Sequence, residues 1–158
     1  MTFYLDSSVV DVYLFGLEKE PQRYPDVVAL FEAINAEQAD AIISVYTVQE
    51  VATFCRDSFP PHLFATITRL SIQKLMNVRL QLVPLLTRQE KIQHARRFPI
   101  RDTSDQPHVI LAHLHQCDAL VAYDEHFQDT AHLMPYLRPD EALAKIKTAI
   151  NSSTSKNE

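Results

Sequence analysis

The residues of this chain with the clearest chemical potential are four carboxylic acids, namely Asp6, Glu50, Asp105 and Asp124. Asp6 follows the apolar run 3–5, and Asp124 follows the apolar run 119–123. Both runs are typical of buried parallel strands, and open α/β sheets bind ligands at the carboxyl ends of such strands. Glu50 and Asp105 stand near the starts of two expected helices. All four side chains are therefore expected to converge on one crevice.

This grouping of acids favours metal chemistry. An unpaired charge near a protein core costs several kcal/mol, roughly, unless a cation or hydrogen bonds compensate it. Carboxylate oxygens are the ligands that Mg²⁺ and Mn²⁺ prefer. The four acids thus predict a site for metal-dependent phosphoryl transfer or hydrolysis.

Each acid also has an ordinary structural interpretation. Asp6 with Ser7 and Ser8 can cap a helix, and the segment Thr47–Glu50 fits a capping box. Asp105 suits the first turn of a helix, and Asp124 suits a turn. These interpretations leave unexplained why all four acids fall at the same edge of the expected sheet.

The elements that would position these acids alternate between short apolar runs and longer helical patterns, as in repeated βαβ units. The expected strands are 3–5, 41–43, 80–83 and 119–121, with an edge strand at 133–134. The expected helices are 8–17, 26–36, 48–56, 60–77, 87–98 and 107–116, with a last helix from Pro139. The sequence therefore predicts one α/β domain over residues 1–150, with 151–158 as a polar, disordered tail.

Composition excludes several classes of function. Gly16 is the only glycine among 158 residues, so neither a dinucleotide fingerprint nor a Walker A loop can be present. A nucleophile elbow fails for the same reason. No apolar stretch is long enough to cross a bilayer, and two cysteines without metal-site spacing suit a reducing compartment, so a cytoplasmic location is expected.

The charge distribution bears on nucleic-acid binding. A net charge of −5 argues mildly against a nucleic-acid partner. The segment 88–101 is nevertheless basic, and its residues Arg96, Arg97 and Arg101 are candidates for holding a phosphate backbone. A solvated helix face is the alternative.

The histidines are weaker candidates for a functional site than the acids. His113, His115 and Cys117 are spaced poorly for a zinc site, because residues two apart on a helix point to different faces. His108 and His126 are near the acids in sequence and could touch substrate. Solvated surface histidines are the expected interpretation.

Three segments together resemble the PIN domain family, and within it the VapC-type toxins. They are Tyr4-Leu5-Asp6-Ser7-Ser8, Thr47-x-x-Glu50-Val51, and the segment from Asp105 through Cys117-Asp118-Ala119-Leu120-Val121-x-x-Asp124-x-x-Phe127. The resemblance covers the chain up to about residue 145, and its closing segment is the most specific part.

The resemblance implies a three-layer α/β/α sandwich around a parallel sheet and a Mg²⁺- or Mn²⁺-dependent endoribonuclease. It also implies homodimerisation and a small antitoxin partner. Asp6, Glu50, Asp105 and Asp124 match the family's metal-binding carboxylates. Asp102 does not match the third of these carboxylates, because its spacing to Asp118 differs from the family pattern. Ala122 departs from the pattern, because the family usually has Thr or Ser at that place. This departure bears on the level of catalytic activity and not on the metal site.

In the expected mechanism, Asp6 and Asp105 hold the principal ion, and Glu50 and Asp124 complete its shell through waters or hold a second ion. Glu50 accepts a proton from the attacking water. Ser7 or Ser8 would hydrogen-bond a substrate oxygen. Two rival functions stay open: a PIN-like RNA-binding or protein-interaction module with a vestigial site, and an aspartyl-phosphate phosphatase, for which Ser8 stands where a second Asp is required.

Overall fold

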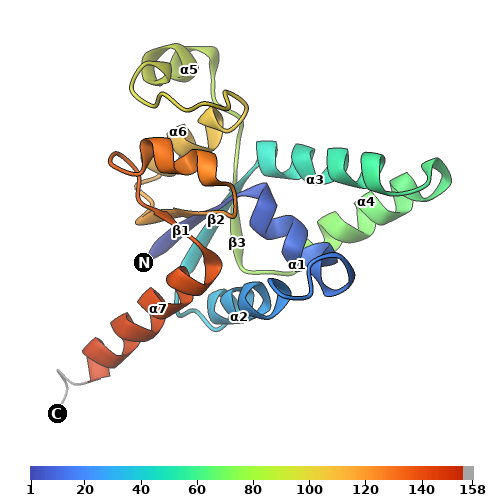
Figure 1. Cartoon of the computed structure of the whole chain (residues 1–158), viewed down its shortest axis with the longest axis horizontal. Coiled ribbons are helices and arrows are strands. Elements are labelled where there is room, and N and C mark those ends of the chain that lie inside the picture. The colour runs from blue at the N-terminus through green and yellow to red at the C-terminus, as the bar shows by residue number, and fades with distance from the viewer. Residues whose placement is uncertain (155–158) are drawn as a thin grey trace.

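A parallel five-stranded sheet forms the centre of the computed structural model, which describes residues 1–154 (Figure 1). The strands are β1 (Thr2–Leu5), β2 (Asp40–Ser44), β3 (Leu80–Val83), β4 (Ala119–Val121) and β5 (Tyr136–Leu137). Their order across the sheet is β3-β2-β1-β4-β5, and every neighbouring pair is parallel. The predicted α/β sandwich is confirmed.

Helices cover both faces of the sheet. They are α1 (Ser7–Lys19), α2 (Tyr24–Asn35), α3 (Val45–Ser58), α4 (Pro61–Met76), α5 (Arg88–Ala95), α6 (Gln106–Leu114), α7 (Pro139–Thr154) and the 3₁₀ helix η1 (Glu125–Thr130). Helices α3 and α4 form an arm that projects from the body of the molecule (Figure 1). No helix within residues 1–154 is long and apolar enough to cross a membrane.

The alternation of side chains along the strands gives the molecule two cores. Phe3 and Leu5 of β1 pack with α1, α2 and α7 on one face, whereas Tyr4 packs with α6 on the other. Central parallel strands are buried on both faces, which is why their sequences read as continuous apolar runs. The single glycine, Gly16, serves this packing: an added Cβ would lie 2.8 Å from Val12 and 3.2 Å from Tyr24.

The course of the chain creates a ligand crevice. From the central strand β1 the chain builds outward through β2 to β3, and it then returns to place β4 on the other side of β1. Such a reversal opens a gap at the carboxyl ends of the two strands that flank it. Asp6 occupies this point, and its backbone N–H donates to the carbonyl of Val121 at 3.0 Å.

Several predicted boundaries differ from the structure. The edge strand is not at 133–134, because the N–H groups of Leu133 and Met134 both bond to the Thr130 carbonyl in a turn, and the strand begins after Pro135. The helix expected to end at 98 ends at Ala95. Helix α7 continues to Thr154, where the Ser152 hydroxyl donates to the Thr148 carbonyl. The remainder of the predicted tail, 155–158, lies outside the described residues.

Candidate metal centre

Asp6 is buried at the end of β1, with 4% of its surface exposed, and it caps α1. Its Oδ2 accepts hydrogen bonds from the Ser8 backbone at 2.9 Å and from the Ser8 hydroxyl at 2.7 Å. Its Oδ1 faces His108 Nδ1 at 3.8 Å. Capping therefore uses one oxygen of Asp6 and leaves the other directed toward the crevice.

Ser8 ties the start of α1 to the end of β4. Its hydroxyl donates to Asp6 and accepts a hydrogen bond from the Tyr123 N–H at 3.0 Å. These contacts give Ser8 a structural function beside any contact with substrate. Ser7, the first residue of α1, is partly buried.

Glu50 is not part of a capping box, contrary to one sequence-based interpretation. Helix α3 begins at Val45, and its capping box joins Ser44 and Thr47. Glu50 consequently lies in the second turn, where its Oε1 is 3.0 Å from His108 Nε2. Its Oε2 is buried without a hydrogen-bond partner, so this atom is available to a ligand.

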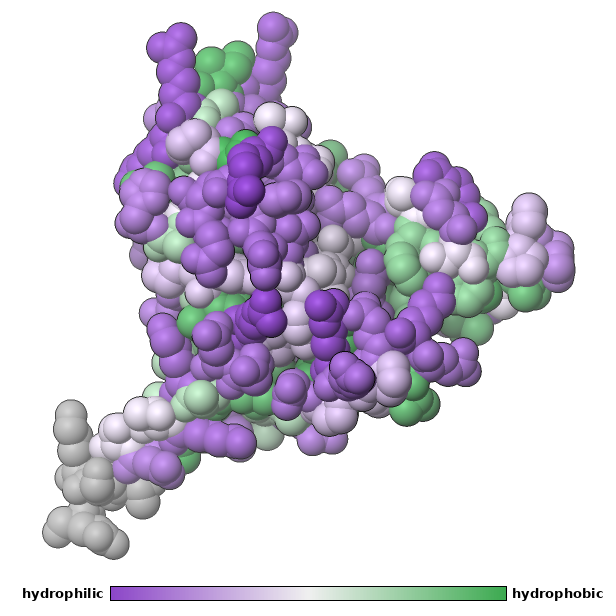
Figure 2. Space-filling model, in the orientation of Figure 1, coloured by the Kyte–Doolittle hydropathy of each residue, from purple (hydrophilic) through white to green (hydrophobic). Residues whose placement is uncertain are grey.

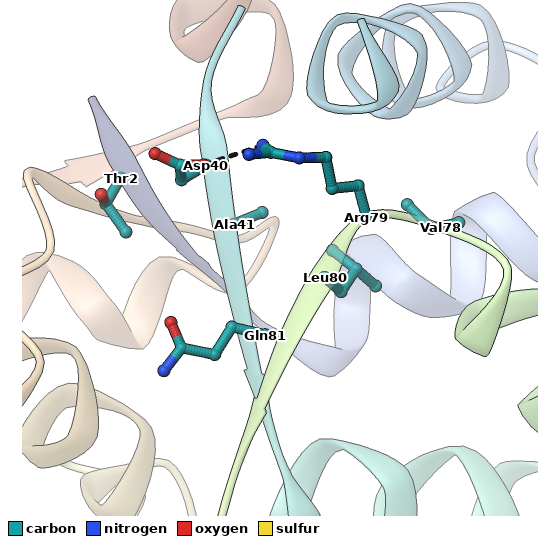
Figure 3. A pocket seen from close by; sticks show the side chains of 7 residues that line it. All are labelled: Thr2, Asp40, Ala41, Val78, Arg79, Leu80 and Gln81. Carbon is teal, nitrogen blue, oxygen red and sulfur yellow. Dashed lines mark hydrogen bonds and ion pairs between the residues drawn. The ribbon is translucent and has the colours of Figure 1, made fainter. Parts of the chain in front are cut away.

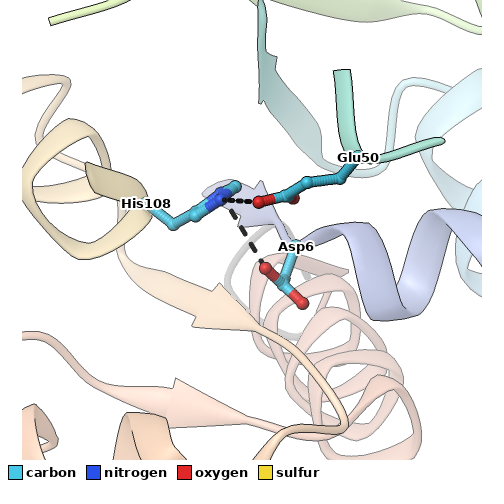
Figure 4. Close-up of side chains that lie close together, drawn as sticks. All are labelled: Asp6, Glu50 and His108. Carbon is cyan, nitrogen blue, oxygen red and sulfur yellow. Dashed lines mark hydrogen bonds and ion pairs between the residues drawn. The ribbon is translucent and has the colours of Figure 1, made fainter. Parts of the chain in front are cut away.

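His108 was predicted to lie on the surface, and that prediction is wrong: the residue is 0% exposed. Figure 4 shows its ring directed toward the carboxylates of both Asp6 and Glu50. The other ring nitrogen, Nδ1, is 3.0 Å from the Tyr4 hydroxyl. Burial alone lowers the pKa of His108, but the hydrogen bond to Glu50 and the surrounding negative charges outweigh it and raise the pKa.

Asp105 and Asp124 approach the ring of His126. Asp105 stands at the N-cap of α6 without capping it, and its buried Oδ2 lacks a hydrogen-bond partner. This oxygen is 3.6 Å from His126 Nδ1. Asp124 accepts from the His126 backbone at 3.0 Å, and its Oδ1 lies 3.1 Å from Nδ1 of that ring.

The acids at this edge repel one another. Burial first, and then the charges of Asp6 and Asp124, raise the pKa of Asp105 to about 6. Burial also raises the pKa of Asp6, although His108 and Ser8 oppose it. Both carboxylates thus lie in an environment that disfavours their charged form.

Asp11 belongs to the same environment and was missed by sequence reasoning. Burial, followed by the charges of Asp6 and Glu50, raises the pKa of Asp11 to about 7. Its buried Oδ1 has no hydrogen-bond partner. Its only sequence signal was an acid next to the apolar residues Val9, Val10 and Val12.

The predicted site residues are arranged as two neighbouring groups. One contains Asp6, Glu50 and His108, and the other contains Asp102, Asp105 and His126; within each, the donor atoms lie within 4.8 Å of one another. Asp124 adjoins the second group through His126. Asp102, which spacing had excluded, thus lies beside Asp105.

This donor set fits a divalent cation. Buried oxygens of Glu50, Asp105 and Asp11 lack hydrogen-bond partners, and buried polar atoms rarely remain unsatisfied. Carboxylate oxygens predominate, which favours Mg²⁺ or Mn²⁺ over softer metals.

A cavity at the opposite edge of the sheet has a different character. It encloses about 360 Å³ at the amino ends of β1, β2 and β3 (Figure 3). Its only cationic lining residue, Arg79, is paired with Asp40 at 2.9 Å. None of the four candidate metal-binding acids lines this cavity.

Several solved structures match this chain, and two of them illustrate a similarity over most of its length. One is VapBC2 from Rickettsia felis bound to a DNA fragment from their promoter, with a TM-score of 0.59 and 14% identity over 87% of this chain and 98% of that chain. The other is VapBC-1 from nontypeable Haemophilus influenzae, with a TM-score of 0.53 and 12% identity over 88% and 98%. The chain has a VapC-like PIN-domain fold. No protein-family model and no curated protein matches the sequence.

On this PIN-domain fold, the three candidate arginines differ in how they are engaged. Arg101 bonds Asp129 through its Nε at 2.9 Å. Arg96 and Arg97 follow α5 and are exposed, and the guanidinium of Arg97 lies 5.6 Å from the ring centre of Phe98. Arg96 and Arg97 therefore have more freedom to contact a ligand than Arg101 has.

Ala122 is fully buried in the core that contains Tyr4 and α6. Its methyl group brings no hydroxyl to the PIN-domain crevice. Hydroxyl groups that contact residues of the two groups come instead from Ser8, Tyr4 and Ser104.

Proposed function

We propose that this chain is a metal-dependent endoribonuclease that hydrolyses RNA phosphodiester bonds and acts as the toxin of a toxin–antitoxin pair. The observation that carries the proposal is the set of buried, unpartnered carboxylate oxygens at the switch point of a PIN-domain sheet. Such strained acids are typical of functional sites. The location expected for this activity is the cytoplasm.

The residues of the two groups have separate tasks in the proposed reaction. Asp6 and Asp105 would hold Mg²⁺ or Mn²⁺, with Glu50 and Asp124 beside them. When bound, the cation supplies Lewis acidity that polarises the scissile phosphate. Glu50 accepts the proton of the attacking water through its free Oε2. Water adds to phosphorus, the bond between phosphorus and the 3′ oxygen breaks, and that oxygen takes up a proton from solvent. The products carry a 5′-phosphate and a 3′-hydroxyl.

The substrate would enter along exposed basic side chains. Arg96 and Arg97 lie between α5 and the loop that leads to Asp105. We assign them to the RNA backbone, with Arg101 contributing less because Asp129 already occupies it. Ser7 and Ser8 complete the substrate-facing set.

A specific observation supports one alternative function. Ala122 leaves the crevice without a hydroxyl that the PIN family usually supplies, and this favours an RNA-binding or protein-interaction module with weak catalysis. The phosphatase alternative has no such support, because Ser8 stands where that class of enzyme requires a second Asp.

The antitoxin partner is proposed to cover an apolar groove between α1 and the α3–α4 arm. Leu14, Phe15 and Ile67 line this groove of about 350 Å³, and Leu17 and Leu70 beside it are 67% and 52% exposed. Figure 2 shows hydrophobic side chains along the arm. Both compared structures are VapBC assemblies, which supports a protein partner. A homodimer is the further expectation.

The proposal is tested by incubating a mixed RNA pool with purified protein in Mg²⁺, Mn²⁺, Zn²⁺ or EDTA. We expect cleavage with Mg²⁺ or Mn²⁺ and none in EDTA, because the donor set is dominated by oxygen. Asp6→Asn serves as the matched inactive control. Cleavage that survives chelation, or that only Zn²⁺ restores, would contradict the proposed function.

A further inference from the structure

His108 joins the candidate metal centre to a chain of buried hydrogen bonds. The Tyr4 hydroxyl donates to Ser44 Oγ at 2.7 Å and contacts His108 Nδ1 at 3.0 Å. Ser44 Oγ in turn accepts the Thr47 N–H at 3.3 Å. The chain therefore runs from the capping box of α3, across the end of β1, to the ring of His108.

Every member of this chain is fixed by burial. Tyr4, Ser44, Thr47 and His108 are each 0% exposed. The ring of Tyr4 also meets the His108 ring edge-on, with centroids 5.7 Å apart. Side chains held in this way have one orientation, and they can hold a more mobile neighbour in one orientation too.

Glu50 is the more exposed neighbour of this chain of hydrogen bonds. Its side chain is 37% exposed, and its one hydrogen bond within the described residues is the 3.0 Å contact from Oε1 to His108 Nε2. Because Oε1 is held, the free Oε2 has a defined direction. Ligating carboxylates are commonly oriented by such outer partners.

We infer that His108 is a positioning residue: it holds Glu50 Oε1 through Nε2, and Tyr4 holds its ring through Nδ1, so that Glu50 Oε2 is presented to the divalent cation. This inference rests on the proposed function. It assigns His108 no contact with RNA and no exchange of protons with the substrate.

Two amide substitutions separate the contacts of His108. Gln reaches about as far as Nε2, so His108→Gln keeps the contact with Glu50. Asn reaches only about as far as Nδ1, so His108→Asn keeps the contact with Tyr4. The matched control is His113→Gln on the same helix, whose ring lies outside the core beside His94 and Phe98.

The readouts are Mn²⁺ affinity by calorimetry, kcat and KM for RNA, and thermal unfolding. We expect His108→Asn to weaken Mn²⁺ binding by about 10- to 100-fold, the usual effect of removing an outer-shell partner. Its kcat should fall while KM for RNA stays near the parental value. The Mn²⁺ affinity of His108→Gln should remain within a few-fold of the parental value. The Mn²⁺ affinity of His113→Gln should equal that of the parent.

Parental Mn²⁺ affinity in folded His108→Asn would overturn the inference, since a merely structural role lowers the melting temperature without changing metal binding. If His108→Asn is unfolded, Tyr4→Phe decides, because it removes one hydroxyl and keeps the ring. A decrease in Mn²⁺ affinity of about 2- to 10-fold, the effect of one hydrogen bond, supports the inference, and an unchanged affinity overturns it.

The parent protein separates this inference from the proposed function. If the parent binds Mn²⁺ and cleaves RNA, and His108→Asn does both equally well, the proposed function stands and only the role of His108 is contradicted. A parent that neither binds Mn²⁺ nor cleaves RNA removes both.

Discussion

Asp105 shows most directly how a single side chain in this crevice opposes folding without a cation. Its folded-state pKa is raised from 3.8 to about 6. A carboxyl group with a raised pKa contributes stability that is fully present below pH 3.8 and is lost as pH rises through about 6. Asp11, with a pKa of about 7, extends this loss toward neutral pH.

Asp105→Asn should therefore raise the melting temperature of the metal-free protein at about pH 7 and change it little at about pH 4. The amide cannot ionise, so the repulsion from Asp6 and Asp124 is relieved only where the parental carboxyl is charged. Mn²⁺ should then stabilise the variant less than the parent, because a ligand that binds only the folded state acts by mass action.

Asp57→Asn is the control for this experiment. Asp57 is exposed, and its hydrogen bond with Arg56 lowers its pKa, so the substitution should not raise the melting temperature at neutral pH. An Asp105→Asn variant that melts like the parent at both pH values, with the full gain from Mn²⁺, would show that Asp105 is not strained.

For single residues, the sequence predicted the positions of the acids better than the burial and contacts of the residues around them. Asp6 and Asp124 could be placed because each directly follows a buried apolar run. The burial of His108 could not be predicted, because it depends on β1 and α3 closing over a helix far along the chain. Asp11 escaped notice because its unpartnered oxygen results from packing of α1, and no local motif encodes packing.

The elements were predicted closely wherever the hydrophobic pattern was strong. Strands β1 to β4 and helices α1 to α6 lie near their expected positions. The start of α3 was misjudged by about one turn, since both Ser44 and Thr47 are suitable caps and only the end of β2 decides between them. That shift changed Glu50 from a capping residue into a residue of the crevice.

The segment after α5 carries the prediction about RNA binding. Replacing Arg96 and Arg97 with Gln should weaken RNA binding for all sequences. It should also lower the slope of log K against log salt by about one unit for each phosphate group that the protein no longer binds. Binding measured at several salt concentrations provides the test. Arg101→Gln should have a smaller effect, because Asp129 already bonds that guanidinium.

Arg56→Gln is the matched control, because Arg56 lies on α3 and is paired with Asp57. An unchanged salt slope in the Arg96 and Arg97 variants would indicate that this segment is simply a solvated surface.

At the scale of the whole molecule, the strand order accounts for the site. Placing β1 between β2 and β4 brings residues as distant in sequence as Asp6, Glu50 and Asp105 to one edge of the sheet. The same topology leaves the α3–α4 arm outside the body, with an apolar groove against α1. Catalysis and partner binding are thus proposed for separate surfaces of one domain.

The chemistry of the cleaved RNA ends tests the central claim most directly. A defined RNA is incubated with the parent and with Glu50→Gln in Mn²⁺, and the ends of the products are identified by mass spectrometry. Metal-assisted attack by water predicts 5′-phosphate and 3′-hydroxyl ends from the parent and a large decrease in rate for Glu50→Gln. Cyclic 2′,3′-phosphate ends, or equal rates in the two proteins, would contradict hydrolysis by this carboxylate site.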